Sequence, residues 1–347
     1  MNKPDISLRD LAALYEAAIE FRDLACWEWM TDSDLFGVEN PETGEIGYCC
    51  VLGQLGEVLA LNVYPGSEGL ASYWRLHEAS SAAMEEGAAL DGGSLLGTQL
   101  CLMASFEDRS ELHQNDLRIV RGLGLKFRGK KRWPMFRSYR PGFVPWFLTP
   151  PEARFLPVAL RQAIEVAARL RDNLDLLDPP DGDTGLYFVR VLEGGTWTDR
   201  WQRPPPYKAP ESVPLLDEVR LARIQRGKLP RRTTWHAACV VLPMVIEEGD
   251  RPYYPCGFPV LSDEGMALGM DLFKPGEVEH ALRDKFLDLI EKLKCLPELL
   301  LVASEETFRL LEPIAGRLGF RIKQADRLPA IEAFLTSMDQ FMAARRT

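Results

Sequence analysis

Apolar residues recur at helical spacing over residues 7–26, and Ser7 is well placed to cap this helix. Beyond this helix, the helical spacing of apolar residues gives way to shorter apolar runs. Residues 35–38, 46–52 and 58–64 are short runs rich in β-branched and aromatic residues, and turns that contain Pro and Gly separate them. Three such strands joined by tight turns form an antiparallel meander. The chain is therefore expected to begin with a helix followed by three antiparallel strands.

Helical spacing returns three times after the meander, and short apolar runs lie between the helical segments. The expected helices are 69–87, 112–122 and 151–172, and the expected strands between them are 100–104 and 125–127. Strands that alternate with helices are expected to join a sheet through parallel crossovers. The element order αβββαβαβα then predicts a mixed five-stranded sheet with helices on its faces.

The same order of elements recurs in the second half of the chain. Its expected helices are 214–224, 277–294, 305–317 and 330–345, and its expected strands are 238–246, 256–261, 267–273, 299–303 and 320–322. Sequence matches accompany this order, since Gly47 matches Gly257. At the same offset, Pro65 matches Pro275. Ordered matches of this kind indicate an internal duplication.

The predicted fold class is therefore α/β, in the wider α+β sense, with two tandem related αβββαβαβα units at residues 1–173 and 213–347. Residues 174–212 are expected to form a Pro-rich connector with its own β-hairpin. A three-strand meander followed by αβαβα is also the order of the ribonuclease-H-like fold. This similarity is one of topology alone, so it carries little weight for function.

Composition narrows the class of protein. The 347 residues carry a net charge of −10 at pH 7, and 46% of them are hydrophobic, as in ordinary soluble proteins without a membrane span. The acidic balance argues against bulk binding of nucleic acid. Residues 1–5 lack the apolar core of a signal peptide, and the seven cysteines are expected to be reduced thiols. These features predict a cytoplasmic protein.

A basic and aromatic segment at residues 128–150 contrasts with this acidic chain, and it has no long counterpart in the second half. Cations interleaved with aromatic rings suit contact with an anionic group, and long loops in compact domains are often functional. Arg137, Tyr139, Arg140 and Trp146 are therefore the candidate ligand-binding residues, for an anionic small molecule or a protein partner. The alternative is that the aromatic residues hold this loop against the core.

Acidic residues near the predicted strand ends are candidates for a metal site. Asp34 lies just before the first strand beside aromatic residues, so it is a further candidate ligand-binding residue; its alternative role is a local turn bond. A two-metal nuclease needs at least three converging carboxylates, and the first strand of the second copy has none. Glu305 and Glu306 follow Ser304 and are typical of a capped helix start. The sequence predicts no metal site and no cofactor.

Two segments resemble an uncharacterised bacterial family of conserved hypothetical proteins. One is the run Trp-Glu-Trp-Met at residues 27–30 with Pro-Glu-Thr-Gly-Glu-Ile-Gly-Tyr-Cys at 41–49, and the other is Arg-Ser-Tyr-Arg-Pro-Gly at 137–142. The resemblance extends over most of the chain. It implies no activity, because no activity is assigned to the family.

Three functional hypotheses follow from these observations. The first is a non-catalytic binding or scaffold protein built from a duplicated α/β unit. The second is a metal-dependent phosphodiesterase or nuclease that is active in the first unit only. The third is a small-molecule enzyme with its site in the first unit or between the units, where pockets tend to form.

Overall fold

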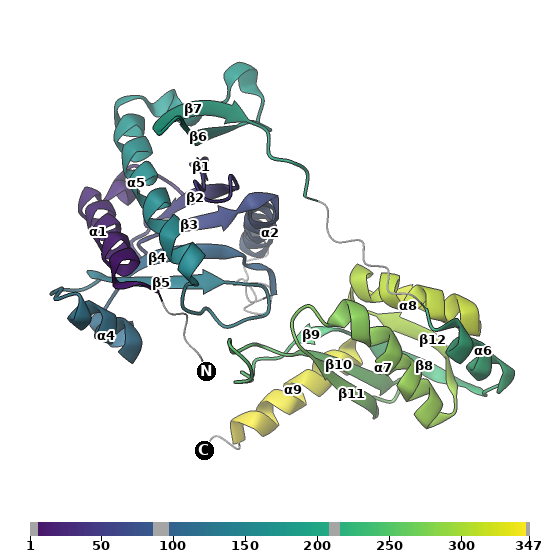
Figure 1. The fold of residues 1–347 in the computed structure, drawn as a ribbon. Helices are drawn as coiled ribbons and strands as arrows, with labels where there is room; N and C mark the ends of the chain where they lie inside the picture. The colour runs from purple at the N-terminus through teal and green to yellow at the C-terminus, as the bar shows by residue number, and fades with distance from the viewer. Residues whose placement is uncertain (1–5, 86–96, 208–215, 345–347) are drawn as a thin grey trace. The chain divides into compact units, whose positions relative to one another are not determined.

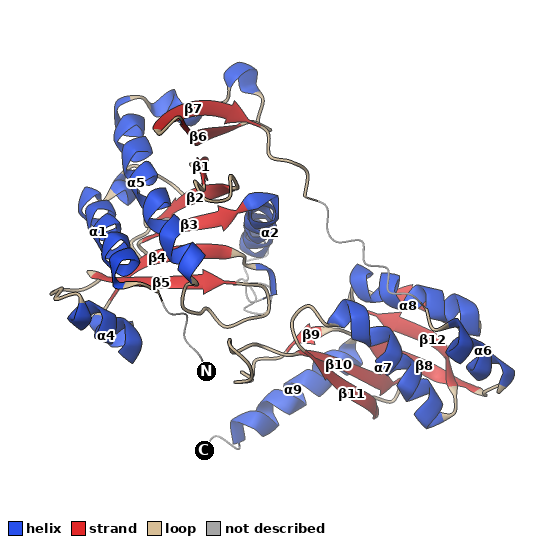
Figure 2. Cartoon of the chain, viewed as in Figure 1, coloured by secondary structure: helices blue, strands red, loops and turns tan. Residues whose placement is uncertain are grey.

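A computed structural model describes residues 6–85, 97–207 and 216–344 (Figure 1). The chain divides into two compact units. The first unit comprises Met1–Lys208 and Glu248–Pro252, and the second comprises Ala209–Glu247 and Tyr253–Thr347. Each unit is a sheet with helices, so the α/β fold class in two tandem units is confirmed (Figure 2).

The first unit contains a seven-stranded sheet in the order β5-β4-β3-β2-β1-β6-β7. Its helices are α1 (Leu8–Leu24), α2 (Gly66–Glu85), α4 (Gln114–Gly122) and α5 (Pro150–Asp172). Its strands are β1 (Phe36–Glu39), β2 (Ile46–Leu52), β3 (Ala60–Pro65), β4 (Cys101–Glu107), β5 (Trp133–Tyr139), β6 (Tyr187–Glu193) and β7 (Thr196–Gln202). The expected αβββαβαβα order is present in residues 8–172, and β6 and β7 extend the sheet beyond it.

The two faces of this sheet carry different cores. On one face α1 and α5 pack over alternate strand residues such as Val51, Leu61 and Ala104, which are fully buried. On the opposite face α2 covers a smaller cluster that includes Tyr48, Tyr64 and Cys50. The period of two along each strand sends successive side chains to opposite faces, and this alternation explains the two clusters. Figure 1 shows α1 and α5 on one side of the sheet and α2 on the other.

The pairing of β4 and β6 differs from the parallel crossovers that were expected. Strand β4 lies beside β3 and runs antiparallel to it, and β5 is antiparallel to β4. The place beside β1 is taken by β6, which is parallel to β1 through Gly37↔Val189. Gly37 permits this approach, because a Cβ atom there would lie 2.9 Å from Val189 Cγ2. The hairpin expected in the connector is thus part of the first sheet, which has seven strands rather than five.

Strand β5 lies inside the segment that was expected to be a loop, residues 128–150. The strand expected at 125–127 is absent, and the chain is irregular there. Burial alternates along β5, with Pro134, Phe136 and Ser138 buried. Arg137, the one cation between these residues, and the basic residues just before the strand hid the alternation in the sequence. Proline is tolerated because β5 is an edge strand, where one row of N–H groups needs no partner.

The second unit is built around the strand order β11-β10-β8-β12-β13, with β9 paired to β10. Its helices are α6 (Glu218–Arg226), α7 (Val278–Leu293), α8 (Glu305–Leu318) and α9 (Pro329–Ala344). Its strands are β8 (Arg231–Ala237), β9 (Val240–Val241), β10 (Cys256–Ser262), β11 (Ala267–Phe273), β12 (Leu296–Val302) and β13 (Arg321–Gln324). Helices α6, α7 and α8 pack on one face, and α9 packs on the other.

The first strand of the second unit lies earlier than expected. The prediction placed it at 238–246, whereas β8 spans Arg231–Ala237 and only the short β9 remains further on. Four polar residues open β8 and are exposed or half-buried, while Trp235 to Ala237 are buried. The polar half of the strand concealed it, because periodicity shows only where apolar residues occur.

The two units share their element order but not their whole strand order. The hairpins β2–β3 and β10–β11 are equivalent, since both are antiparallel second and third strands. In the second unit β12 joins β8 in parallel, as expected for a crossover. In the first unit β4 joins the opposite edge of the meander. The likeness between the units therefore extends through the meander and ends there.

Candidate functional site

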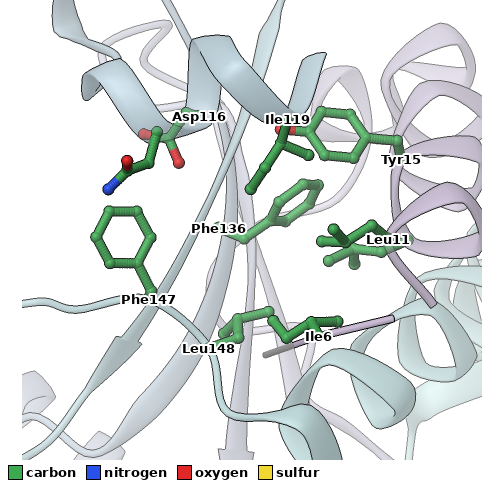
Figure 3. A pocket seen from close by; sticks show the side chains of 10 residues that line it. Ile6, Leu11, Tyr15, Asp116, Ile119, Phe136, Phe147 and Leu148 are labelled. Carbon is green, nitrogen blue, oxygen red and sulfur yellow. The ribbon is translucent and has the colours of Figure 1, made fainter. Parts of the chain in front are cut away.

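A cavity of about 220 Å³ lies in the first unit between α1, α4, β5 and the segment after Trp146 (Figure 3). Most of its lining is apolar. The lining residues are Ile6, Leu11, Leu14, Tyr15, Asn115, Asp116, Ile119, Phe136, Phe147 and Leu148. An apolar cavity with a few polar groups is the usual form of a small-molecule site.

Helical spacing brings α1 to this cavity. Leu11 and Tyr15 are four residues apart, so both lie on the same face of α1. Ser7 caps the helix as expected, because its Oγ accepts a hydrogen bond from Asp10 N at 3.1 Å. The Tyr15 ring meets Phe136 of β5 edge to face, with the ring centroids 5.0 Å apart.

The start of α4 is fixed by a reciprocal cap. His113 Nδ1 accepts a hydrogen bond from Asn115 N at 3.2 Å, and Asp116 Oδ2 accepts one from His113 N at 3.0 Å. This arrangement satisfies N–H groups that have no partner within the helix. It also holds Asn115, Asp116 and Ile119 along one side of α4, facing the cavity.

A buried ion pair forms the polar wall. Arg137 Nη2 lies 2.6 Å from Asp116 Oδ2, and Arg137 Nη1 donates to Asp116 Oδ1 at 3.1 Å. Their side chains are 11% and 6% exposed. The Arg137 guanidinium lies 4.8 Å from the centroid of the Phe147 ring. A paired cation stacked on an aromatic ring is held rigidly, so Arg137 shapes the cavity instead of offering a free charge.

Two polar groups at the cavity remain without hydrogen bonds in the described part of the chain. Asn115 is 6% exposed; its Oδ1 accepts from Arg118 Nη1 at 3.1 Å, but its buried Nδ2 has no partner. The Tyr15 hydroxyl also lacks one, and burial raises the Tyr15 pKa well above its usual value. The phenol is therefore protonated at ordinary pH. Both groups can donate to an acceptor.

Arg140 and Trp146 lie beside this wall and have structural contacts. Arg140 Nη2 lies 3.3 Å from Glu152 Oε1, and the Arg140 side chain is half exposed. Trp146 forms an antiparallel bridge with Ser138, in which each N–H donates to the other carbonyl. Trp146 Nε1 is buried and has no partner among the described residues. These contacts fold residues 140–146 back along β5.

Tyr139 and Asp34 lie elsewhere. Tyr139 is opposite Cys101 and packs on the face that α2 covers, where burial raises its pKa to about 12. Asp34 caps a turn, with its Oδ2 accepting from Thr31 N at 2.6 Å. It precedes β1, which β2, β3 and β4 separate from β5. Of the five candidates, the structure brings together Arg137, Arg140 and Trp146.

The acidic residues near the strand ends have local roles. Ser304 Oγ accepts a hydrogen bond from Thr307 N at 3.1 Å, so Glu305 and Glu306 occupy the first turn of a capped helix. Within the described residues, no three His, Cys, Asp or Glu side chains are grouped so as to hold a metal ion. All seven cysteines are free thiols, and Cys49, Cys50, Cys101 and Cys295 are among those that are buried.

Sequence reasoning found Arg137 but missed the residues that complete the cavity. Asp116 lies 21 residues before its partner Arg137. Tyr15 is one of the residues at helical spacing within 7–26, a pattern that indicates a core-facing helix and not a ligand site. An acidic residue in a first turn is common, so Asp116 gave no distinct signal. Asn115 could have been noticed only as an amide on the apolar side of the helix at 112–122.

The structure thus defines a two-unit α/β protein whose first unit contains a cavity of ligand size. Residues 12–190 match the family model of a domain of unknown function, DUF7309, and residues 220–339 match another, DUF6930. Since the first match covers more than half of the chain, the protein belongs to the DUF7309 family. The expected membership of an uncharacterised family is confirmed.

No curated protein and no solved structure matches the chain. The similarity to the ribonuclease-H-like topology therefore stays a prediction. Among the helices that the structure describes, none has both the length and the apolar character required to cross a bilayer.

Proposed function

We propose that the protein is a non-catalytic binding protein, and that its first unit binds a compact, mainly apolar molecule that carries one hydrogen-bond acceptor. The cavity beside Asn115 supports this proposal most directly. A buried polar group without a partner costs about 1–3 kcal/mol, and an acceptor on a ligand would remove that cost for Asn115 Nδ2. We place this function in the cytoplasm, where free thiols persist.

The size and charge of the cavity restrict the ligand. A volume of about 220 Å³ is below the range of roughly 300–1,000 Å³ typical of drug-sized ligands, so a fragment-sized molecule fits. Arg137 already has Asp116 as its counterion, and this neutral pair does not attract an anion strongly. The anionic ligand expected from the basic segment is therefore not the ligand proposed for this cavity.

Two probes of nearly the same shape test the proposal. Acetophenone has a carbonyl acceptor, and ethylbenzene has none. We expect ligand-observed NMR on the full chain to show acetophenone binding about tenfold more tightly, since one satisfied hydrogen bond is worth about 1.4 kcal/mol. Equal binding of the two probes by the wild type would contradict the role of Asn115.

Variants of the full chain locate the binding. Asn115→Leu combined with Tyr15→Phe removes both donors of the cavity, so this variant should bind the two probes equally. Ile119→Trp fills the cavity and should bind neither. Asn173→Leu is the matched control, because Asn173 is exposed at the end of α5, and it should behave like the wild type. If Ile119→Trp bound acetophenone as the wild type does, the cavity would not be the binding site.

A further inference from the structure

A second cavity, of about 370 Å³, lies on another face of α4 in the first unit. Its lining residues are Arg109, Leu117, Val120, Arg121, Leu125, Lys126, Phe127, Arg128 and Trp133. Helix α4 contributes Leu117, Val120 and Arg121 here, and residues 115, 116 and 119 to the first cavity. At about 100° per residue, these two sets lie on different faces of the helix.

The lining combines four cations with no carboxylate. Arg109, Arg121, Lys126 and Arg128 are exposed side chains, and none of them forms an ion pair within the described residues. This concentration of positive charge occurs on a chain whose net charge is −10. Positive charges gathered on one surface create a local potential that attracts an anion.

The backbone holds these cations in place. Gly124, with a φ of +69°, reverses the chain at the end of α4, and Leu125 N donates to Val120 O at 3.0 Å. The reversal returns Lys126 and Arg128 along the last turn of α4, next to Arg121. Arg121 Nε donates to Leu117 O at 3.1 Å, and this bond further restricts its position.

Aromatic rings form one wall of this cavity. Phe127 and Trp133 meet edge to face, with ring centroids 5.6 Å apart. The Arg109 guanidinium lies 5.8 Å from the centroid of the Trp133 ring. A flat ring or an apolar body of a ligand can pack against such a wall while its charged end contacts the cations.

The simpler explanation is that the cations stabilise the negative end of the α4 dipole. That end carries about half of an elementary charge. Arg121 alone offsets it, so three further cations remain to be explained. We propose that this cavity binds an organic phosphate that carries at least two negative charges. Arginine donors in a fork suit phosphate oxygens, and the aromatic wall accepts the organic part.

Calorimetric titration of the full chain at low salt tests this site with three probes: ADP, pyrophosphate and adenosine. We expect ADP to bind most tightly, pyrophosphate more weakly and adenosine least, because the cations contribute more than the aromatic wall. Affinity for ADP should fall steeply as salt rises, as for a charge-dominated contact. Absence of both ADP and pyrophosphate binding at low salt would overturn the proposal.

Charge reversal distinguishes this cavity from general attraction. Arg121→Glu with Arg128→Glu should weaken ADP binding at least about tenfold. Arg226→Glu with Lys323→Glu changes the net charge equally at exposed positions of the second unit, and it should leave ADP binding unchanged. Equal weakening by both pairs would show non-specific attraction only, and would refute the site.

Two further measurements keep the result interpretable. Circular dichroism melting checks that the charge-reversed variant is folded. If it is not folded, the neutral pair Lys126→Gln with Arg128→Gln replaces it. Unchanged ADP binding by that neutral pair would refute the site. Trp133→Leu should reduce ADP affinity to that of pyrophosphate. Acetophenone binding in the first cavity should be unaffected by these variants, so the two proposals fail separately.

Discussion

Arg137 contributes to the first cavity through its partner and not through a free charge. Both members of the Arg137–Asp116 pair are nearly buried, and the guanidinium also stacks on Phe147. Removing one member of a buried pair leaves the other charge uncompensated in a medium of low polarity. The pair is therefore expected to be a sensitive point of the first unit.

We predict that Asp116→Asn destabilises the first unit by about 3 kcal/mol, because it leaves the buried Arg137 guanidinium without its counterion. Urea unfolding of the full chain measures this free energy. The comparison is Arg140→Gln, which removes a half-exposed ion pair with Glu152 and should cost less than about 1 kcal/mol. Equal losses in the two variants would contradict the distinction between the buried and the exposed pair.

A second charged group joins β6, β7 and α5. Arg190 is 5% exposed and contacts Asp199 of β7 at 2.5 Å, Glu165 of α5 at 2.7 Å and Gln162 of α5 at 3.0 Å. Hydrogen bonding from Arg169 lowers the pKa of Asp199, and Arg190 lowers it further. The charged form of Asp199 is thus favoured in the folded protein.

Because its pKa is lower in the folded state, Asp199 stabilises the protein above its ordinary pKa of about 4, and this stabilisation is lost as the pH falls through the lower folded value. We predict that Asp199→Asn is less stable than the wild type at neutral pH, by up to about 1 kcal/mol because solvent screens the group. The gap should close on acidification. Urea midpoints across a pH series measure it, and a gap that stays constant down to about pH 2 would rule out this linkage.

Prediction from sequence reached some residues of the candidate sites and not others, for a physical reason. Arg137 stood out because cations interleaved with aromatic residues contrast with an acidic chain. Asp116 and Asn115 gave no such contrast, since polar residues are ordinary at a helix start. Asp116 and Asn115 belong to the site because of contacts between distant parts of the chain, and no local sequence pattern indicates such contacts.

At the scale of elements, β6 depends on a glycine in β1. A Cβ atom at position 37 would lie 2.7 Å from Ile46 Cγ2 and 2.9 Å from Val189 Cγ2. Only a residue without a side chain leaves room at this position for the side chains of Ile46 and Val189. This contact joins the hairpin of β6 and β7 to the rest of the sheet.

We predict that Gly37→Val destabilises the first unit by about 1–3 kcal/mol, as overpacked sites usually do. Differential scanning calorimetry should show its transition several degrees lower. Gly122→Ala is the control, because nothing lies within 4 Å of a Cβ atom there and its φ is not positive. The control should change stability by less than about 1 kcal/mol. Similar melting of Gly37→Val and the wild type would show that β6 does not need the gap.

Elements with strong periodicity were predicted well, and mixed ones were not. Strand β2 has the expected bounds, and α5 begins and ends within one residue of the prediction. Strand β5 was missed because Arg137 and its neighbours interrupt the apolar alternation, and β8 because its first half is polar. The edge of the meander at which β4 pairs could not be predicted either, because the order of elements along the chain does not determine it.

At the scale of the whole molecule, each unit has its own apolar core. Leu156 lies in the core of the first unit and Leu311 in that of the second, and both are fully buried. We predict that Leu156→Ala and Leu311→Ala each cost about 2–5 kcal/mol. Each should lower only the calorimetric transition of its own unit. A single transition that both variants shift equally would show that the units unfold together.

Helix α4 has one further consequence. It is nine residues long and supplies side chains to both cavities, so the two proposed ligands would share a wall. If filling one cavity tilts this helix, the affinity of the other must change by some factor. Thermodynamic reciprocity then requires that filling the second cavity change the affinity of the first by the same factor. A short helix placed in this way would make the occupancy of an apolar site and of an anion-binding site a single, shared equilibrium.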